Sequence, residues 1–265
     1  MGLQSAKPSW IVSLKTIRIS IMKKVLISAT ALLAASFASA DTVKMGTEGA
    51  YAPWNFINDA GELAGFEIEL GNELCARAGI ECEWVVNEWD SIIPNLVAGN
   101  YDTIIAGMSI TAERDELIDF TQDYYPPDPS KWAATADMGA DVDPSGATVG
   151  VQASTIQAAW VAENLGDAVT IKEYSTADES MADLSAGVVD LVLADGGYLA
   201  PFVDGESIFF VGPDVMIGGG VSMGIRETDA ELKASMNAAI DSVKADGTLD
   251  SLIMKYFETG PFYAN

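Results

Sequence analysis

Length, composition and charge set the first limits on what this chain can do. It has 265 residues, 39 acidic side chains against 14 basic ones, a formal net charge of −25 and no histidine. Such an acidic surface repels nucleic acid and anionic membranes, which are bound through basic patches. Without histidine there is no Ser-His-Asp or Cys-His nucleophile and no imidazole metal site, so we expect no metal and no cofactor.

The N-terminus indicates export. Met22 is followed by two lysines, residues 25–37 are apolar, and Ala-Ser-Ala then ends at Ala40, which is the pattern of a secretory signal peptide cut after that residue. Residues 1–21 are either a long basic region or precede a true start at Met22, and we place them outside the fold. The apolar run is too short to span a bilayer. Cleavage would leave residues 41–265, with a formal charge of −30.

The only two cysteines are Cys75 and Cys82. In an exported chain, an isolated pair seven residues apart favours a disulfide, here between the end of a helix and the next strand. A free thiol or a metal role fits less well, because two cysteines without histidine make a poor ligand set. We expect the short closed loop to add roughly 2 to 3 kcal/mol of stability.

Strand and helix patterns alternate in the first half of the exported chain. In chain order, the expected elements are a strand at 42–46, a helix at 67–78 ended by Gly79, a strand at 82–86, a helix capped by Asp90 and reaching residue 98, and a buried strand at 103–106. This rhythm predicts a mainly parallel sheet with helices on both faces. Ligands of such sheets bind beyond the carboxyl ends of the strands, where Glu48 and Ser109 fall.

A proline-rich run at 124–129 breaks this pattern. Three prolines in four residues cannot continue a helix or a central strand, so we expect a hinge there. Three glycines at 218–220 mark a second crossing, and two crossings imply that the last segment returns to the first lobe. Between and after them we expect strands at 148–151, 169–171, 188–193 and 221–225, and helices at 154–165, 180–186, 229–245 and 248–257.

Two short segments point to a ligand. Residues 47–54 place Glu48 and two aromatic side chains in a turn, and residues 106–114 end a buried strand in small and hydroxyl residues, with Arg114 close behind. Together they supply aromatic stacking faces, an anion to meet a cation, and a fixed cation to meet a carboxylate. This set of groups suits a free amino acid.

Several motifs recur in the order typical of one family. They are Tyr-Ala-Pro-Trp at 51–54, Gly-Phe-Glu-Ile-Glu-Leu at 65–70, Ile-Ile-Pro-Asn-Leu at 92–96, Ser-Ile-Thr at 109–111 with Arg114, Ile-Asp-Phe-Thr at 118–121, and Asp-Gly-Thr at 246–248. With them the exported chain resembles, along nearly its whole length, the periplasmic solute-binding proteins of polar amino acid ABC transporters (bacterial extracellular solute-binding proteins, family 3). Within that group it is most similar to the arginine and octopine/nopaline receptors.

The resemblance implies an α/β fold of the type II periplasmic binding protein class, with mainly parallel sheets. Lobe I would comprise 41–125 plus 223–265 and lobe II 130–213, joined by hinge crossings at 126–129 and 214–222. It also implies a monomeric, non-enzymatic protein of the periplasm. Its partners would be a free amino acid and an inner-membrane ABC permease.

The resemblance also assigns the groups that hold the backbone of the ligand. Arg114 would bind the α-carboxylate through its rigid fork of donors, and its alternative is a surface salt bridge to a neighbouring acidic residue. Asp195 would receive the α-ammonium, and Thr155 would offer its amide and hydroxyl to the α-carboxylate; for both, the alternative is a helix N-cap. Gly107 and Ser109 match further contacts, although this chain has Ala106 and Gly107 where relatives carry a serine.

The remaining assignments concern the side chain of the ligand. Tyr51 and Trp89 match two aromatics that sandwich it, with a place in the core as the alternative. Glu48 and Glu67 match positions that recognise a distal cation, with plain surface charge as the alternative, and Glu48 is favoured because it lies in the cleft turn.

We therefore expect a hinge-closing receptor for a cationic amino acid, arginine first, then lysine, ornithine, histidine or an opine. A smaller polar ligand such as glutamine stays open. Two other classes are a secreted cyclohexadienyl or arogenate dehydratase on the same fold, which would need a carboxylic acid as general acid, and the sensor module of a signalling receptor. The paired Arg114 and Asp195 favour an amino acid pocket over the dehydratase.

Overall fold

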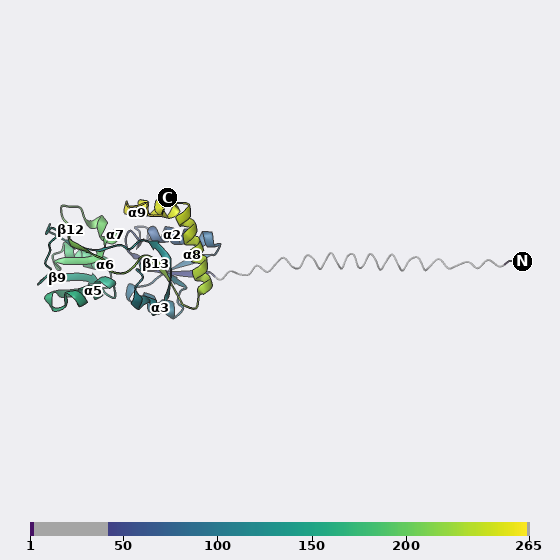
Figure 1. The fold of residues 1–265 in the computed structure, drawn as a ribbon, viewed down its shortest axis with the longest axis horizontal. Helices are drawn as coiled ribbons and strands as arrows, with labels where there is room; N and C mark the ends of the chain where they lie inside the picture. The colour runs from purple at the N-terminus through teal and green to yellow at the C-terminus, as the bar shows by residue number, and fades with distance from the viewer. Residues whose placement is uncertain (3–41, 264–265) are drawn as a thin grey trace. The chain divides into compact units, whose positions relative to one another are not determined.

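The described residues build two five-stranded sheets and a small three-stranded one within the fold drawn in Figure 1. The computed structural model describes residues 1–2 and 42–263, so the predicted signal peptide lies outside the described residues. Among the helices of the described range, none combines the length and the apolar character needed to cross a membrane. The small sheet consists of β2 (Ala50–Tyr51), β3 (Asn55–Ile57) and β4 (Leu63–Ala64).

The first large sheet has the strand order β5-β1-β6-β13-β7. Its strands are β1 (Val43–Thr47), β5 (Cys82–Val86), β6 (Thr103–Ile104), β7 (Asp119–Tyr125) and β13 (Val221–Ile225). β1 runs parallel to β5 and β6, whereas β13 is antiparallel to both β6 and β7. The helices of this part are α2 (Phe66–Ala78), the 3₁₀ turn η1 (Trp89–Ser91), α3 (Ile92–Val97), α4 (Ala112–Asp115), α8 (Ala230–Ala245) and α9 (Thr248–Phe257).

The second large sheet has the strand order β10-β9-β11-β8-β12. Its strands are β8 (Ser130–Ala134), β9 (Thr148–Gln152), β10 (Thr170–Tyr174), β11 (Leu191–Asp195) and β12 (Phe209–Val215). β9 is parallel to β10 and β11, while β8 is antiparallel to β11 and β12. Its helices are α5 (Ile156–Asn164), α6 (Ala177–Ser185) and α7 (Gly196–Leu199), with the 3₁₀ turns η2 (Gly166–Ala168) and η3 (Ala200–Phe202).

The chain passes from one sheet to the other twice. The first passage, 126–129, joins β7 to β8, and the second, 216–220, joins β12 to β13; neither contains a helix or a strand. The fold is the predicted α/β class, but its sheets are mixed because the strands beside the passages run antiparallel. The lobe boundaries and the hinge role of the passages stay predictions.

Helix α2 illustrates how the sequence directs local structure. Its apolar positions, among them Leu70 and Leu74, are buried, which matches the period of a helix with one face on the core. Gly79 ends it with a left-handed φ of 69°, a conformation that glycine adopts without steric cost. The predicted disulfide between Cys75 and Cys82 is confirmed and joins α2 to β5.

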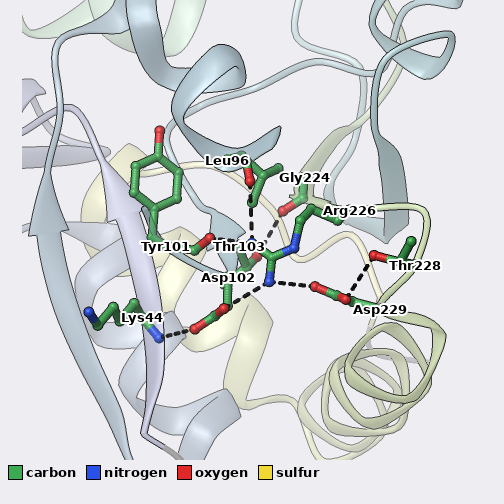
Figure 2. A network of polar contacts seen from close by, with 9 residues as sticks. All are labelled: Lys44, Leu96, Tyr101, Asp102, Thr103, Gly224, Arg226, Thr228 and Asp229. Atoms are coloured by element: carbon green, nitrogen blue, oxygen red, sulfur yellow. Dashed lines mark hydrogen bonds and ion pairs between the residues drawn. The ribbon is translucent and has the colours of Figure 1, made fainter. Parts of the chain in front are cut away.

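Arg226, one residue beyond β13, is the centre of a polar network (Figure 2). Its Nη2 lies 2.8 Å from Asp102 Oδ1 and 2.6 Å from Asp229 Oδ2, and its Nη1 donates to the carbonyls of Leu96 and Tyr101. The guanidinium thus ties the end of β13 to the start of β6 and to the turn before α8. Four acceptors surround this one cation, and two of them are carboxylates, so the guanidinium clamps three segments of the chain together.

The prediction that Asp90 caps a helix is wrong. Asp90 lies inside the 3₁₀ turn η1, and α3 begins only at Ile92. The side chain of Asp90 therefore comes before the unpaired backbone amides to which an N-cap residue of α3 would bond. The chain enters α3 through a tighter 3₁₀ turn, which is frequent at helix N-termini. This turn positions Trp89, whose side chain is buried.

Candidate ligand-binding site

A small cavity lies among residues that come from both large sheets. Its wall is formed by Glu48, Tyr51, Trp89, Ala106, Gly107, Ser109, Arg114, Gln152, Thr155, Ile156, Gln157 and Asp195. Several of these follow the carboxyl ends of the parallel strands β1, β6, β9 and β11, where an α/β sheet binds its ligands.

Eight of the nine predicted ligand residues line this cavity. The ninth, Glu67, lies behind the wall and is completely buried. Its carboxylate accepts hydrogen bonds from Asn55 Nδ2 at 2.7 Å, from the amide of Gly107 at 2.6 Å and from the Tyr124 hydroxyl. Burial raises the pKa of Glu67 in spite of these donors. In this position Glu67 holds the backbone of the wall and does not face the space that a ligand would occupy.

Arg114 differs from every other cation in the described chain. Residues 42–263 contain nine lysines and arginines, and eight of them form an ion pair with a carboxylate within 4.0 Å, whereas Arg114 forms none. Its Nη1 donates to the Ser109 carbonyl at 2.8 Å, and its Cζ lies 5.2 Å from the Trp89 ring centroid. The alternative salt bridge to a neighbouring acidic residue is therefore not formed.

Burial lowers the pKa of Arg114 to about 10, with the charges of Asp195 and Glu113 acting in the opposite direction. The guanidinium thus stays charged at neutral pH. A desolvated cation with remaining donor capacity and no anion beside it is a ready site for the carboxylate of a ligand.

Asp195 lies at the end of β11 on the other side of the cavity. Its Oδ2 accepts a hydrogen bond from the Tyr51 hydroxyl at 2.7 Å, and its Oδ1 accepts one from Gln157 Nε2 at 2.7 Å. Burial raises the pKa of Asp195, and the Tyr51 hydrogen bond and the charge of Arg114 oppose this shift. Asp195 precedes α7, but its side chain makes no capping hydrogen bond, so the carboxylate is directed to cavity residues.

Glu48, just after β1, is the second carboxylate of the cavity. Its side chain is buried, and its Oε1 accepts a hydrogen bond from Gln152 Nε2 at 2.6 Å. Burial raises the pKa of Glu48 to about 7; the Gln152 hydrogen bond lowers it, and the nearby carboxylate of Asp178 raises it further. A group with this pKa changes its charge near neutral pH, and a cation beside it would favour the ionised form.

The two predicted aromatics both line the cavity, and each already contacts other groups of the protein. The ring of Tyr51 stacks on Tyr198, with centroids 4.4 Å apart and planes 5° apart. Trp89 carries Arg114 over its ring and donates from Nε1 to the Ser154 carbonyl at 3.1 Å. The sandwich of a ligand side chain between Tyr51 and Trp89 stays a prediction.

Thr155 acts as the N-cap of α5. Its hydroxyl accepts from the amide of Ala158 at 3.1 Å and donates to the Gln152 carbonyl at 2.7 Å. The alternative weighed from the sequence, N-capping, is therefore present, and the predicted ligand contact stays a prediction. Gly107 has a φ of 63°, and its amide is taken by Glu67.

Two glutamines of the wall, Gln152 and Gln157, were missed as binding candidates by sequence reasoning. Gln157 donates from Nε2 to Asp195 and to Ser130 Oγ at 2.9 Å, and Gln152 contacts Glu48. The available signal was their position, at the end of β9 and in the first turn of α5, on either side of the predicted Thr155. Because a glutamine side chain carries no charge, its place in a sequence is easily interpreted as that of an ordinary solvent-exposed residue.

The model of the bacterial extracellular solute-binding proteins, family 3, matches residues 43–259. The chain belongs to this family. Among curated relatives of family 3, it is similar to the L-arginine-binding protein of Pseudomonas aeruginosa, 35% identical over 92% of this chain and all of the relative. It is also similar to the lysine/arginine/ornithine-binding periplasmic protein of Escherichia coli, 34% identical over 89% of this chain and 98% of the relative.

A solved structure extends the likeness to three dimensions. A periplasmic His/Glu/Gln/Arg/opine family-binding protein from Silicibacter pomeroyi, crystallised in complex with lysine, is 58% identical, with a TM-score of 0.78 over 84% of this chain and 100% of that one. The type II periplasmic binding fold is thus confirmed for this member of family 3. Its named relatives are binding proteins rather than enzymes, and the chain is a solute-binding protein.

Proposed function

We propose that this protein is the periplasmic component of an ABC transporter and captures a cationic amino acid for delivery to a membrane permease. Arginine is our first choice, followed by lysine, ornithine, histidine and opines. Two of the relatives above are an L-arginine-binding and a lysine/arginine/ornithine-binding protein, and the third was crystallised with lysine. Two of the three are periplasmic proteins, so the relatives support both the ligand class and the compartment.

The observation that carries the proposal is the set of charges around the cavity. Arg114 contributes one positive charge, and Asp195 and Glu48 contribute two negative ones when both are ionised. The sum is −1, which complements the +1 of an amino acid with a cationic side chain. A neutral amino acid would leave one buried carboxylate without a cation, which is costly in a desolvated site.

In this proposal each charge of the ligand has a partner in the cavity. Arg114 would donate to the α-carboxylate, Asp195 would accept from the α-ammonium, and Glu48 would accept from the distal cation. Since Arg114 and Glu48 come from the part of the chain that builds the first sheet and Asp195 from the second, only an arrangement with both sheets near the ligand satisfies all three. Differential contacts of this kind would drive closure.

The test is isothermal titration calorimetry of the exported protein, freed of bound ligand by unfolding and refolding, against the common amino acids and octopine. Glu48→Gln is measured in parallel, with Glu62→Gln as a matched control because its side chain is exposed, away from the cavity. Tight arginine binding that weakens only in Glu48→Gln supports the proposal. Preference for a neutral amino acid, unaffected by Glu48→Gln, contradicts the cationic specificity.

A further inference from the structure

The hydrogen bond between Gln152 and Glu48 joins the two halves of the cavity. Glu48 follows β1 of the first sheet, and Gln152 is the last residue of β9 in the second. Their side chains meet at 2.6 Å, and both are buried. Within the described residues, Gln152 is the one side chain that donates a hydrogen bond to this carboxylate.

The position of the Gln152 amide is determined on several sides. Its Nε2 donates to Glu48 Oε1 and to the carbonyl oxygen of Ser175 at 3.1 Å. Both partners are acceptors, so the NH₂ end and not the oxygen end of the amide must lie between them. The main-chain carbonyl of Gln152 accepts a hydrogen bond from the Thr155 hydroxyl, and the same hydroxyl caps α5.

The surroundings of Glu48 explain why this one donor matters. The other charged groups that act on it are carboxylates, those of Asp178, Glu67 and Asp90, and burial adds to their effect against ionisation. The Gln152 amide is the opposing influence. A charge-assisted hydrogen bond from a buried donor stabilises the ionised form, which is the only form that attracts a cation.

Resting on the function proposed above, we infer that Gln152 is a specificity-determining residue, which orients Glu48 and favours its ionised form for the cationic end of the ligand. It acts through Glu48 as a positioning residue. Because the contact crosses from one sheet to the other, recognition of the ligand's distal cation is complete only when both sheets are in place. A neutral ligand that does not need Glu48 is insensitive to this contact.

The test compares Gln152→Leu with the unmodified exported protein in titrations with arginine and with glutamine. We expect arginine affinity at pH 7.5 to fall about tenfold or more, because Glu48 loses its donor, while glutamine affinity changes by less than about threefold. The rise of arginine affinity with pH is expected to move to higher pH. Gln122→Leu is the matched control, since its side-chain amide bonds Asn237, Asp241 and Lys244, away from the cavity.

A second variant tests the same inference in case Gln152→Leu does not fold. Gln152→Lys keeps a donor toward the Ser175 carbonyl and places an ammonium beside Glu48, so we expect it to abolish the preference for arginine over glutamine while glutamine still binds. Equal loss of affinity for both ligands, or unchanged selectivity in the folded variants, overturns the inference. An unmodified protein that prefers glutamine overturns the proposed function and this inference together, whereas normal selectivity in Gln152→Leu overturns only the inference.

Discussion

Two arginines of the same chain meet opposite surroundings. Arg226 has two carboxylates and two carbonyls around its guanidinium, so all of its contacts are supplied by the fold (Figure 2). Arg114 has one carbonyl and one aromatic face, and no carboxylate within 4.0 Å among the described residues. A cation whose partners are all internal stabilises the fold, whereas a cation kept without an anion is available to a ligand.

Removing the guanidinium of Arg114 is expected to have the largest effect, and this effect should fall on ligand binding and not on stability. Arg114→Ala should weaken arginine binding by about 2 to 5 kcal/mol, because the ligand carboxylate would be buried without its charge partner. The free energy of unfolding without ligand should change by less than about 1 kcal/mol, since no ion pair is lost. Calorimetry and urea unfolding measure the two quantities. A large loss of stability with intact binding would reverse the roles given to the two arginines.

Removing the guanidinium of Arg226 is expected to do the converse. Arg226→Ala breaks contacts to Asp102 and Asp229 and leaves two carbonyls without their donor, so we expect a loss of about 2 to 3 kcal/mol of stability. Arginine affinity of the folded fraction should stay within about twofold. Urea unfolding followed by titration below the unfolding transition separates the effects.

The pH dependence of binding sharpens the contrast on the acidic side of the cavity. With a pKa of about 7 in the free protein, Glu48 is mostly protonated at pH 6 and mostly ionised at pH 8. A bound cation lowers this pKa, so arginine affinity should fall by about tenfold from pH 8 to pH 6, with proton release on binding near neutrality. Titration in buffers of different ionisation enthalpy measures the release. Glu48→Gln should lose this pH dependence of arginine affinity. If the pH dependence persisted in Glu48→Gln, it would belong to another group, such as Asp195.

The smallest effect is expected at an exposed ion pair. Lys44 Nζ lies 3.8 Å from Glu83 Oε1, and both side chains are about half exposed. Lys44→Ala should change the free energy of unfolding by less than about 0.5 kcal/mol and leave binding unchanged, because solvent and salt screen such pairs. A loss of stability as large as that of Arg226→Ala would mean that solvent exposure does not determine how much a paired cation contributes to the free energy of unfolding.

The helices were the more predictable part of the fold. α8 and α9 match the predicted ranges within one residue, because long amphipathic segments with a clear stop carry a strong periodic signal. The strands β7, β8 and β12, next to the passages, were not predicted. β12 contains Gly212 and Pro213, which interrupt the alternation of a strand, and β8 starts directly after the prolines.

At the site, the sequence located the strand ends well but could not supply orientation. Asp195 ends one buried strand and Glu48 follows another, so their place beside the cavity could be predicted. Glu67 lies in the first turn of α2, and the direction in which that turn faces depends on tertiary packing that no local pattern encodes. The contact between Gln152 and Glu48 joins residues 104 positions apart, and only the fold brings them together.

The arrangement of the two passages has a mechanical consequence. β7 and β13 are neighbours in the first sheet, and β8 and β12 are neighbours in the second, so the two connections run between adjacent strand pairs. In the predicted hinge role, two such adjacent connections would bend more easily than they twist. We therefore expect a single dye-to-dye distance between the two sheets to follow ligand capture in real time.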